Sequence, residues 1–372
     1  MGQYLMPTQV ITGQDCIVTN SGLMQAYGKK AMIVTGRSSA KKNGAQADVV
    51  EALEAEGIDW CLYDKVMSNP TIACAYEGAA FARKEDVDFI VAIGGGSPID
   101  GAKAMALLAV NHLEEDQLFD NSRHSKSLPL VAVPTTAGTG SEVTQYSMLM
   151  NDVLETKSAL AAPTLFPKLT FLDPKYMMTL PLTVTINTAI DALSHSVEGM
   201  LALRASTISD ALAKESIGLV MEVLSDIQTF IESNQGAQLS YQAREKLLLG
   251  STLGGMVIAQ TGTTAVHAMG YSLTYFKDID HGRANGLLLG HFMKLVEKEA
   301  PSLTKKVVDA MGVKDIEAYI DMMDALLLEK ESMTIEEIEK YSAKAIQTPN
   351  IKNCVVTPSR EDLAEVFIKA FA

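Results

Sequence analysis

The sequence lacks the features of several specialised protein classes. Its 372 residues include only four cysteines, which are widely scattered and form no C-x-x-C pair: Cys16, Cys61, Cys74 and Cys354. Such cysteines predict neither a disulfide framework nor a structural zinc site. No apolar run approaches the roughly 18 residues that span a bilayer, and the opening MGQYLMPTQV lacks the basic and apolar segments of a secretory signal. We therefore expect a reduced, cytoplasmic protein that does not enter a membrane.

Basic clusters are also missing. Lys and Arg total 31 against 45 Asp and Glu, which gives a formal net charge of −14. Proteins that bind nucleic acid or anionic membranes usually present a basic stripe, so we expect neither kind of partner. The composition is otherwise that of a globular protein, with 47% hydrophobic residues. The length favours two domains of roughly 150–200 residues each.

The first half of the chain alternates short apolar runs with helix-like segments. The runs are rich in Val and Ile, end in Gly, Pro or Thr, and predict strands at 31–36, 89–96, 130–136 and 169–174. Segments between them, such as GAQADVVEALEAEG, predict amphipathic helices. This alternation predicts an α/β domain over 1–180 with a parallel sheet covered on both faces.

The second half has a helical period instead. One predicted helix has its apolar residues on a single face: Ile217, Val220, Leu224, Ile227 and Ile231. TIEE at 334–337 and SRED at 359–362 are typical helix N-caps. We therefore predict an all-α domain over 181–372, with the boundary near Leu180 to Leu182.

A glycine-rich turn follows the predicted strand at 89–96. In VAIGGGSPIDGAK, the residues Gly94, Gly95 and Gly96 allow the backbone to approach a bound group closely. Consecutive N–H groups before a helix can bind an anion such as a pyrophosphate. The pattern is not G-x-G-x-x-G, so the usual dinucleotide fingerprint is absent. A tight turn without a ligand is the alternative interpretation.

A second polar loop follows the strand at 130–136. It reads PTTAGTGSEVT, and the hydroxyls of Thr135, Thr136 and Thr139 could bind a ribose, a phosphate or a carboxamide. Two such loops at the carboxyl ends of strands indicate a ligand crevice.

The stretch DALSHSVEGM places Asp191 and His195 four residues apart, on one face of a predicted helix. By itself this pair could be a metal site or an ordinary polar pair on a helix surface. The sequence has six histidines. We expect His112 and His124 to lie on the surface, and His291 to be a hydrogen-bonded core residue.

The other two histidines, His267 and His281, are 14 residues apart. They could share one face of a long helix, or come from a helix and the loop after it. Together with Asp191 and His195 they would supply one carboxylate and three imidazoles, a set that suits Fe(II), Zn(II) or Mn(II).

These motifs, in this order, resemble those of the iron-containing (group III) alcohol dehydrogenases. The resemblance extends over almost the whole chain: GGGSPID, PTTAGTGSEVT, DALSHSVEG, then a histidine and HGRANG. It implies a dinucleotide-binding α/β domain, an all-α metal-binding domain and an active site in the cleft between them. It also implies that Asp191, His195, His267 and His281 bind the metal, iron(II) in that family. Members are commonly dimeric or larger.

The resemblance further implies how a nicotinamide cofactor would bind. Gly94 to Ser97 would hold the pyrophosphate, and Asp100 would touch the nicotinamide side. Lys157 matches a position that contacts the cofactor ribose. The reaction would be hydride transfer between this cofactor and a small alcohol or aldehyde.

The sequence departs from the family pattern at two positions. Many members have a histidine near the nicotinamide where this chain has Tyr271, and a phenol is a poor proton carrier at neutral pH. NAD-preferring members often have an Asp where this chain has Gly36, followed by Arg37, Ser38 and Ser39. Cations and hydroxyls favour a 2′-phosphate, so we predict a preference for NADP(H) over NAD(H). The alternative is that this segment is a solvated helix start.

Two other functions remain as alternatives. A related enzyme of the same fold, such as a glycerol dehydrogenase or a dehydroquinate synthase, usually has fewer imidazoles and a differently placed acid. A cofactor-binding protein without catalytic activity would not require the complete Asp-His-His-His set.

Overall fold

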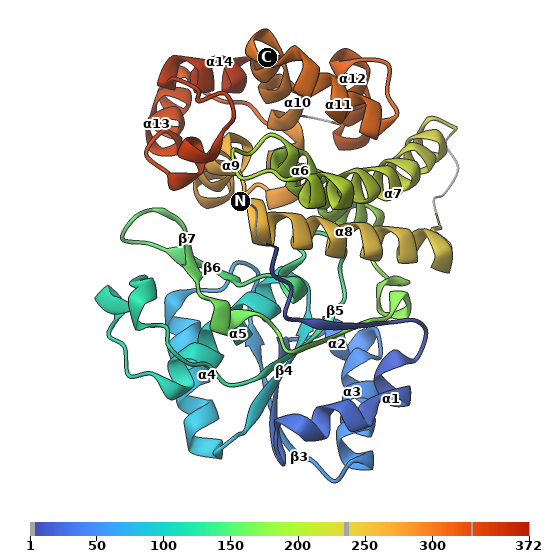
Figure 1. The fold of residues 1–372 in the computed structure, drawn as a ribbon, viewed down its shortest axis with the longest axis vertical. Helices are drawn as coiled ribbons and strands as arrows, with labels where there is room; N and C mark the ends of the chain where they lie inside the picture. The colour runs from blue at the N-terminus through green and yellow to red at the C-terminus, as the bar shows by residue number, and fades with distance from the viewer. Residues whose placement is uncertain (1–3, 234–237, 329, 372) are drawn as a thin grey trace.

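The computed structural model describes residues 4–233, 238–328 and 330–371. Figure 1 shows a sheet with helices on both faces in the lower half and a group of helices above it. The prediction of an α/β domain followed by a helical domain is confirmed.

The sheet is parallel and has the strand order β1-β8-β5-β4-β2-β3. Its strands are β1 Gln9–Thr12, β2 Lys30–Gly36, β3 Asp59–Val66, β4 Phe89–Gly94, β5 Leu130–Pro134 and β8 Leu169–Leu172. The four predicted strands are confirmed, and three of them end two residues earlier than predicted. Two strands, β1 and β3, were not predicted from the sequence, and they form the two edges of the sheet. Edge strands are partly solvated, so they need no continuous apolar run.

Helices cover both faces of the sheet, as β4 illustrates. Phe89, Val91 and Ile93 belong to one apolar cluster, with α1 Cys16–Thr19 and α3 Ala45–Ala55. Ile90 and Ala92 belong to another, with α4 Ile72–Glu85 and α5 Gly96–Val110. A short helix, α2 Ser39–Lys42, follows β2. The predicted helix in GAQADVVEALEAEG is α3.

The upper half is built from helices. They are α6 Leu182–Met200, α7 Thr207–Glu232, α8 Tyr241–Thr261, α9 Ala265–Lys277, α10 His281–Glu299, α11 Pro301–Met311, α12 Ile316–Leu327, α13 Ile335–Ala345 and α14 Arg360–Ala370. No strand of a sheet follows β8 in the described part of the chain. The predicted apolar face of α7 packs into the core. Thr334 and Ser359 form the predicted N-caps, each as a capping box.

Short 3₁₀ helices connect these elements: η1 Ser21–Tyr27, η2 Glu115–Gln117, η3 Asn121–Arg123, η4 Ser141–Val143, η5 Pro163–Leu165, η6 Pro174–Met177 and η7 Pro349–Asn353. Within the ranges that the structure describes, no helix is long and apolar enough to cross a membrane.

An antiparallel hairpin, β6 Tyr146–Asn151 and β7 Thr156–Ala161, was not predicted from the sequence. It leaves the sheet half and reaches up towards α9 and α13 (Figure 1). At its tip, Tyr275 in α9 donates to Asp152 at 3.1 Å, and Lys344 in α13 pairs with Glu155 at 3.1 Å. The tip of the hairpin is therefore attached to the helical half.

Candidate metal and cofactor site

A large cavity of about 1280 Å³ lies between the sheet and the helices. The loops after β2, β4 and β5 line it from below, and α6, α9 and α10 line it from above. The strands are parallel, so their carboxyl ends meet at this edge of the sheet, where α/β proteins usually bind ligands. The hairpin contributes Leu154 and Lys157 to its wall.

The glycine turn after β4 packs closely against the loop after β5. A Cβ on Gly95 would lie 2.6 Å from Thr136 Oγ1, and a Cβ on Gly96 would lie 2.5 Å from Thr139 Cγ2. Gly94 has φ +150°, which disfavours a side chain. The glycines therefore have a structural reason, because a side chain at Gly95 or Gly96 would separate the two loops.

The structure places most of the predicted cofactor residues on the cavity wall. Those that line it are Gly36, Ser39, Gly95, Gly96, Ser97, Asp100, Thr135, Thr136, Thr139 and Lys157. Gly94 is buried beneath the turn, and Arg37 and Ser38 are exposed outside the lining. Lys42, one turn further along, does line the cavity, whereas Lys41 pairs with Asp64 at 3.1 Å.

Asp100 is part of a buried polar network. It accepts hydrogen bonds from Ser141 Oγ at 2.5 Å and from the Met148 N–H at 3.2 Å. Lys103, which is fully buried, donates to Ser141 O at 2.6 Å, to Ser141 Oγ at 2.8 Å and to two further oxygens. Burial raises the pKa of Asp100 and lowers the pKa of Lys103 to about 8. Lys103 was not predicted from the sequence, although it lies one helical turn after Asp100.

Four residues from three helices come together at the top of the cavity. Asp191 and His195 belong to α6, His267 to the first turn of α9, and His281 is the first residue of α10. The two histidines 14 residues apart therefore come from two helices, not from one long helix. Asp280 caps α10, accepting hydrogen bonds from the N–H groups that follow His281.

One nitrogen of each histidine in this cluster lies at the same distance from one carboxylate oxygen. Asp191 Oδ1 lies 3.9 Å from the Nε2 atoms of His195, His267 and His281 alike. One ligand atom each from Asp191, His267 and His281 lies within 4.8 Å of the other two. Tetrahedral metal sites with bonds of about 2.1 Å separate their ligand atoms by about 3.4 Å. A small adjustment would therefore fit Asp191, His267 and His281 to a divalent ion, whereas His195 lies 3.9 Å from Asp191 but outside this group of three.

The electrostatics of the cluster also suit a cation. Burial lowers the pKa values of His195 and His281, so both rings are neutral and can offer a lone pair. Burial acts in the same direction on His267, but the Glu198 carboxylate outweighs it and raises the pKa of that ring. Nδ1 of His195 and Nδ1 of His281 have no hydrogen-bond partner among the described residues.

The close approach of α10 to α6 depends on Gly282. A Cβ at this position would lie 1.8 Å from Asn187 O and 3.1 Å from Asp191 Cβ. Glycine thus allows the first turn of α10, with His281, to lie directly against the turn of α6 that carries Asp191.

Two residues next to the cluster were missed by the sequence analysis. Asn285 Nδ2 donates to Asp191 Oδ1 at 3.0 Å and lies 3.3 Å from His267 Nε2. Glu198 contacts the other side of the His267 ring. Helical spacing could have indicated both, because Glu198 is seven residues after Asp191 and Asn285 is four after His281.

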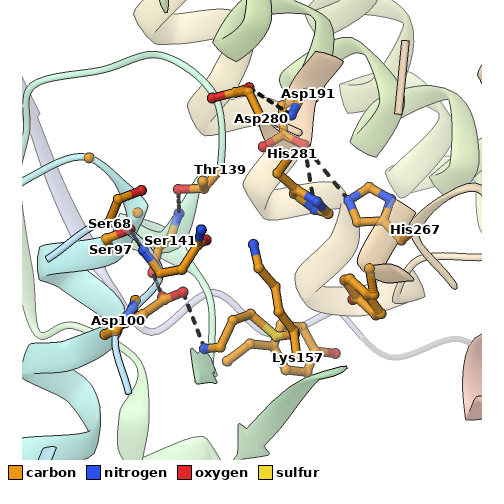
Figure 2. Close-up of a pocket in the computed structure, with 18 of the residues that line it drawn as sticks. Ser68, Ser97, Asp100, Thr139, Ser141, Lys157, Asp191, His267, Asp280 and His281 are labelled. Atoms are coloured by element: carbon orange, nitrogen blue, oxygen red, sulfur yellow. Dashed lines mark hydrogen bonds and ion pairs between the residues drawn. The ribbon is translucent and has the colours of Figure 1, made fainter. Parts of the chain in front are cut away.

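Two side chains face the cluster from the cavity. The Tyr271 ring stacks on His281 with centroids 5.7 Å apart, and burial raises its pKa. Figure 2 shows Lys157 directed from the hairpin towards His267 and His281. Burial lowers the pKa of Lys157.

The other histidines lie away from the cluster. His112 is exposed, as predicted. The prediction for His124 is wrong: it is buried, with Nε2 2.8 Å from Leu118 O, because the polar connection folds back over its ring. His291 is only partly buried, and its Nδ1 has no hydrogen-bond partner within the described ranges.

Comparison with known proteins gives the family of the chain. Residues 7–174 match the profile described as iron-containing alcohol dehydrogenase, and residues 185–371 match the C-terminal profile of the Fe-containing alcohol dehydrogenase family. The chain belongs to this family of oxidoreductases. The resemblance inferred from its motifs is therefore confirmed.

Individual relatives support the same assignment. A crystal structure of an iron-containing alcohol dehydrogenase from Thermotoga maritima superposes with a TM-score of 0.92 at 36% identity, covering 100% of this chain and 99% of that chain. Alcohol dehydrogenase 4 of Schizosaccharomyces pombe is 32% identical over 332 residues, which are 88% of this chain and 77% of the relative. Lactaldehyde reductase of Escherichia coli is 31% identical over 321 residues, 86% of this chain and 78% of the relative.

Proposed function

We propose that this chain is a metal-dependent alcohol dehydrogenase and aldehyde reductase. The observation that carries the proposal is the position of Asp191 Oδ1, 3.9 Å from each of three imidazole nitrogens at the top of a cavity lined by the glycine turn. Asp191, His195, His267 and His281 are the proposed ligands. Iron(II) follows from the family, and the donor set also suits zinc or manganese.

The cavity offers a place for each part of the reaction. A bound divalent ion supplies Lewis-acid polarisation of the alcohol or aldehyde oxygen. The N–H groups of Gly95, Gly96 and Ser97 bind the pyrophosphate at the start of α5. Its volume of about 1280 Å³ exceeds the roughly 300–1,000 Å³ of a usual ligand pocket, which leaves room for a small substrate beside a dinucleotide.

Other side chains position the cofactor. Thr135, Thr136 and Thr139 contribute hydroxyls to the crevice, Asp100 borders the nicotinamide, and Lys157 contacts the ribose. Tyr271 has a raised pKa because it is buried. It therefore keeps its proton at neutral pH and acts as a hydrogen-bond donor to a ligand rather than as a proton carrier.

Removal of one ligand tests the metal site. His281→Ala should abolish metal binding and aldehyde reduction while the fold survives, because the removed ring borders the cavity rather than the closely packed core of the helices. His291→Ala is the matched control, since it changes a histidine of the same helix that lies outside the cavity lining. Metal content per chain, circular dichroism and turnover with a panel of aldehydes are the measurements. Wild-type turnover by His281→Ala would contradict the proposed metal site.

We also propose a preference for NADP(H). Gly36 lines the cavity where an acid would repel a 2′-phosphate, and Ser39 and Lys42 lie beside it. The two other predicted contacts, Arg37 and Ser38, need a side-chain movement to reach the same ligand. Charge-assisted hydrogen bonds contribute about 1.5–3 kcal/mol when desolvated and less when exposed, so we expect a preference of about tenfold or more.

Gly36→Asp should reverse this preference. The site tolerates the side chain, because a Cβ at Gly36 would lie 3.4 Å from Val66 O and 4.0 Å from Ser39 Oγ. Gly36→Asn is the control of similar size without a charge. The deciding quantity is the ratio of kcat/KM for NADPH and NADH with one aldehyde. If the wild-type chain used NADPH and NADH with equal kcat/KM, the segment from Gly36 to Ser39 would be only a helix start.

Three further properties remain proposals. We propose that the domains divide between residues 180 and 181, in the segment between the end of β8 at Leu172 and the start of α6 at Leu182. We also propose a homodimer or larger homo-oligomer and a cytoplasmic location, as the family and the composition suggest. Light scattering and cell fractionation would test the last two.

A further inference from the structure

Glu198 lies completely buried beside the metal cluster without belonging to it. Its side chain comes from α6, seven residues after Asp191, and is 0% exposed. A buried carboxylate is costly unless several hydrogen bonds compensate it. The contacts of its two oxygens therefore show what this residue does.

The two oxygens have different partners. Oε1 accepts hydrogen bonds from Thr264 N at 2.8 Å, from Thr264 Oγ1 at 2.6 Å and from His267 N at 3.4 Å, all at the start of α9. Among the residues that the structure describes, Oε2 has a hydrogen-bond contact with His267 Nδ1 alone. One oxygen thus holds the helix, and the other holds the imidazole.

The contact with Nδ1 determines the tautomer of His267. A carboxylate can only accept, so the ring must carry a proton on Nδ1. Nε2 is then left with its lone pair, and Nε2 is the atom that lies 3.9 Å from Asp191 Oδ1. A histidine must offer such a lone pair in order to bind a metal, and the partner of its other nitrogen sets which atom does so.

We propose that Glu198 is a positioning residue for the metal centre: it fixes the ring of His267 and keeps a proton on Nδ1, so that Nε2 is free to bind the ion. This inference rests on the proposed metal site. It assigns to Glu198 a role beyond holding the start of α9.

Glu198→Gln separates the role of Glu198 at the start of α9 from its role at the His267 ring. A glutamine can keep its carbonyl oxygen towards Thr264 and so preserve the contacts at the start of α9. Its amide then donates towards His267 Nδ1, which must accept, and the proton moves to Nε2, where it blocks the metal. We expect the affinity for Zn²⁺, measured by competition with a chelator, to fall about 10- to 100-fold.

Two controls accompany this variant. Thr264→Val removes the hydroxyl contact with Oε1 but leaves Oε2 and the tautomer unchanged, so its Zn²⁺ affinity should stay close to that of the wild type. Glu142→Gln replaces another buried carboxylate, one that accepts from Thr252 Oγ1 at 2.8 Å rather than from a histidine, and should also leave the affinity unchanged.

The tautomer can be observed directly in the wild-type protein. Nitrogen-15 NMR of the metal-free full chain, with histidine labelled and His267 assigned by substitution, should show a proton on Nδ1. A proton on Nε2 alone would overturn the inference, even if Glu198→Gln failed to fold. Equal Zn²⁺ affinity of Glu198→Gln and the wild type would overturn it as well. A wild-type chain that binds neither Zn²⁺ nor Fe²⁺ would instead overturn the proposed function, and this inference with it.

Discussion

Gly282→Ala tests whether the metal cluster depends on the close contact between α6 and α10. The added Cβ would lie 1.8 Å from Asn187 O, and contacts below 3.0 Å essentially never occur. The backbone of α10 must therefore move away from α6 by about 1.2 Å, because the opposing atom is itself backbone. His281, the preceding residue, moves with it.

This displacement is large compared with the tolerance of a metal site. Metal–ligand distances agree with ideal values to within about 0.2 Å, so His281 can no longer share an ion with Asp191. Overpacking of this kind also costs about 1–3 kcal/mol of stability. A misplacement of about 1 Å can cost about 100-fold in rate, so we expect kcat/KM to fall by about that factor.

The assays are chelator competition for metal affinity, thermal unfolding of the metal-free chain and kcat/KM with a saturating cofactor. Gly218→Ala is the control: it lies on the exposed side of α7, and no atom of the described chain outside the helix backbone lies within 4 Å of the added Cβ. That variant should gain about 0.5–1 kcal/mol of stability. If Gly282→Ala kept the metal affinity and rate of the wild type, the close helix contact would not position His281.

Two further predictions concern stability. Lys103→Met should lower the free energy of unfolding by about 3–5 kcal/mol in urea, because it removes a buried cation and its four donated hydrogen bonds. The difference from the wild type should be larger at pH 9.5 than at pH 7.5: folded Lys103 has a pKa of about 8 against about 10.4 when unfolded, so the unfolded chain binds more protons between these values and raising the pH favours the folded wild type. A constant difference would refute this assignment. Addition of metal at 100 times its dissociation constant should raise the free energy of unfolding by about 2.7 kcal/mol in the wild type and not in His281→Ala, as differential scanning calorimetry would show.

The central strands were predictable because their burial appears directly in the sequence as a continuous apolar run. β4 is buried on both faces, so FIVAIG had to be a continuous apolar run that ends at a glycine. The edge strand β3 has only two of its eight residues fully buried and reads DWCLYDKV, a pattern that a loop could also have. The hairpin was missed because its strands are only partly buried and form no continuous apolar run.

The residues of the site also divide into those that the sequence could indicate and those that it could not. The chemical types of Asp191, His195, His267 and His281 indicated a metal cluster, and the family resemblance indicated which residues share it. Spacing could not tell whether His267 and His281 come from one helix or two, because the turn at Asp278 to Asp280 carries no strong signal. Lys103 was missed for another reason: a charged residue within a helix usually faces water, and only packing shows that Lys103 is buried.

The tip of the β6–β7 hairpin connects the two halves of the molecule more weakly than the backbone contact between them does. The tip is held by partly exposed pairs, Lys344 with Glu155 and Tyr275 with Asp152, and such pairs contribute only about 0–1 kcal/mol each. Elsewhere the halves meet backbone to backbone, where a Cβ on Gly140 would lie 2.4 Å from Gly255 Cα. The contact at the hairpin tip is therefore the weaker of the two. Exchange of a dinucleotide should begin with separation of the hairpin tip from the helices, and salt, which screens the Lys344–Glu155 pair, should make that separation faster.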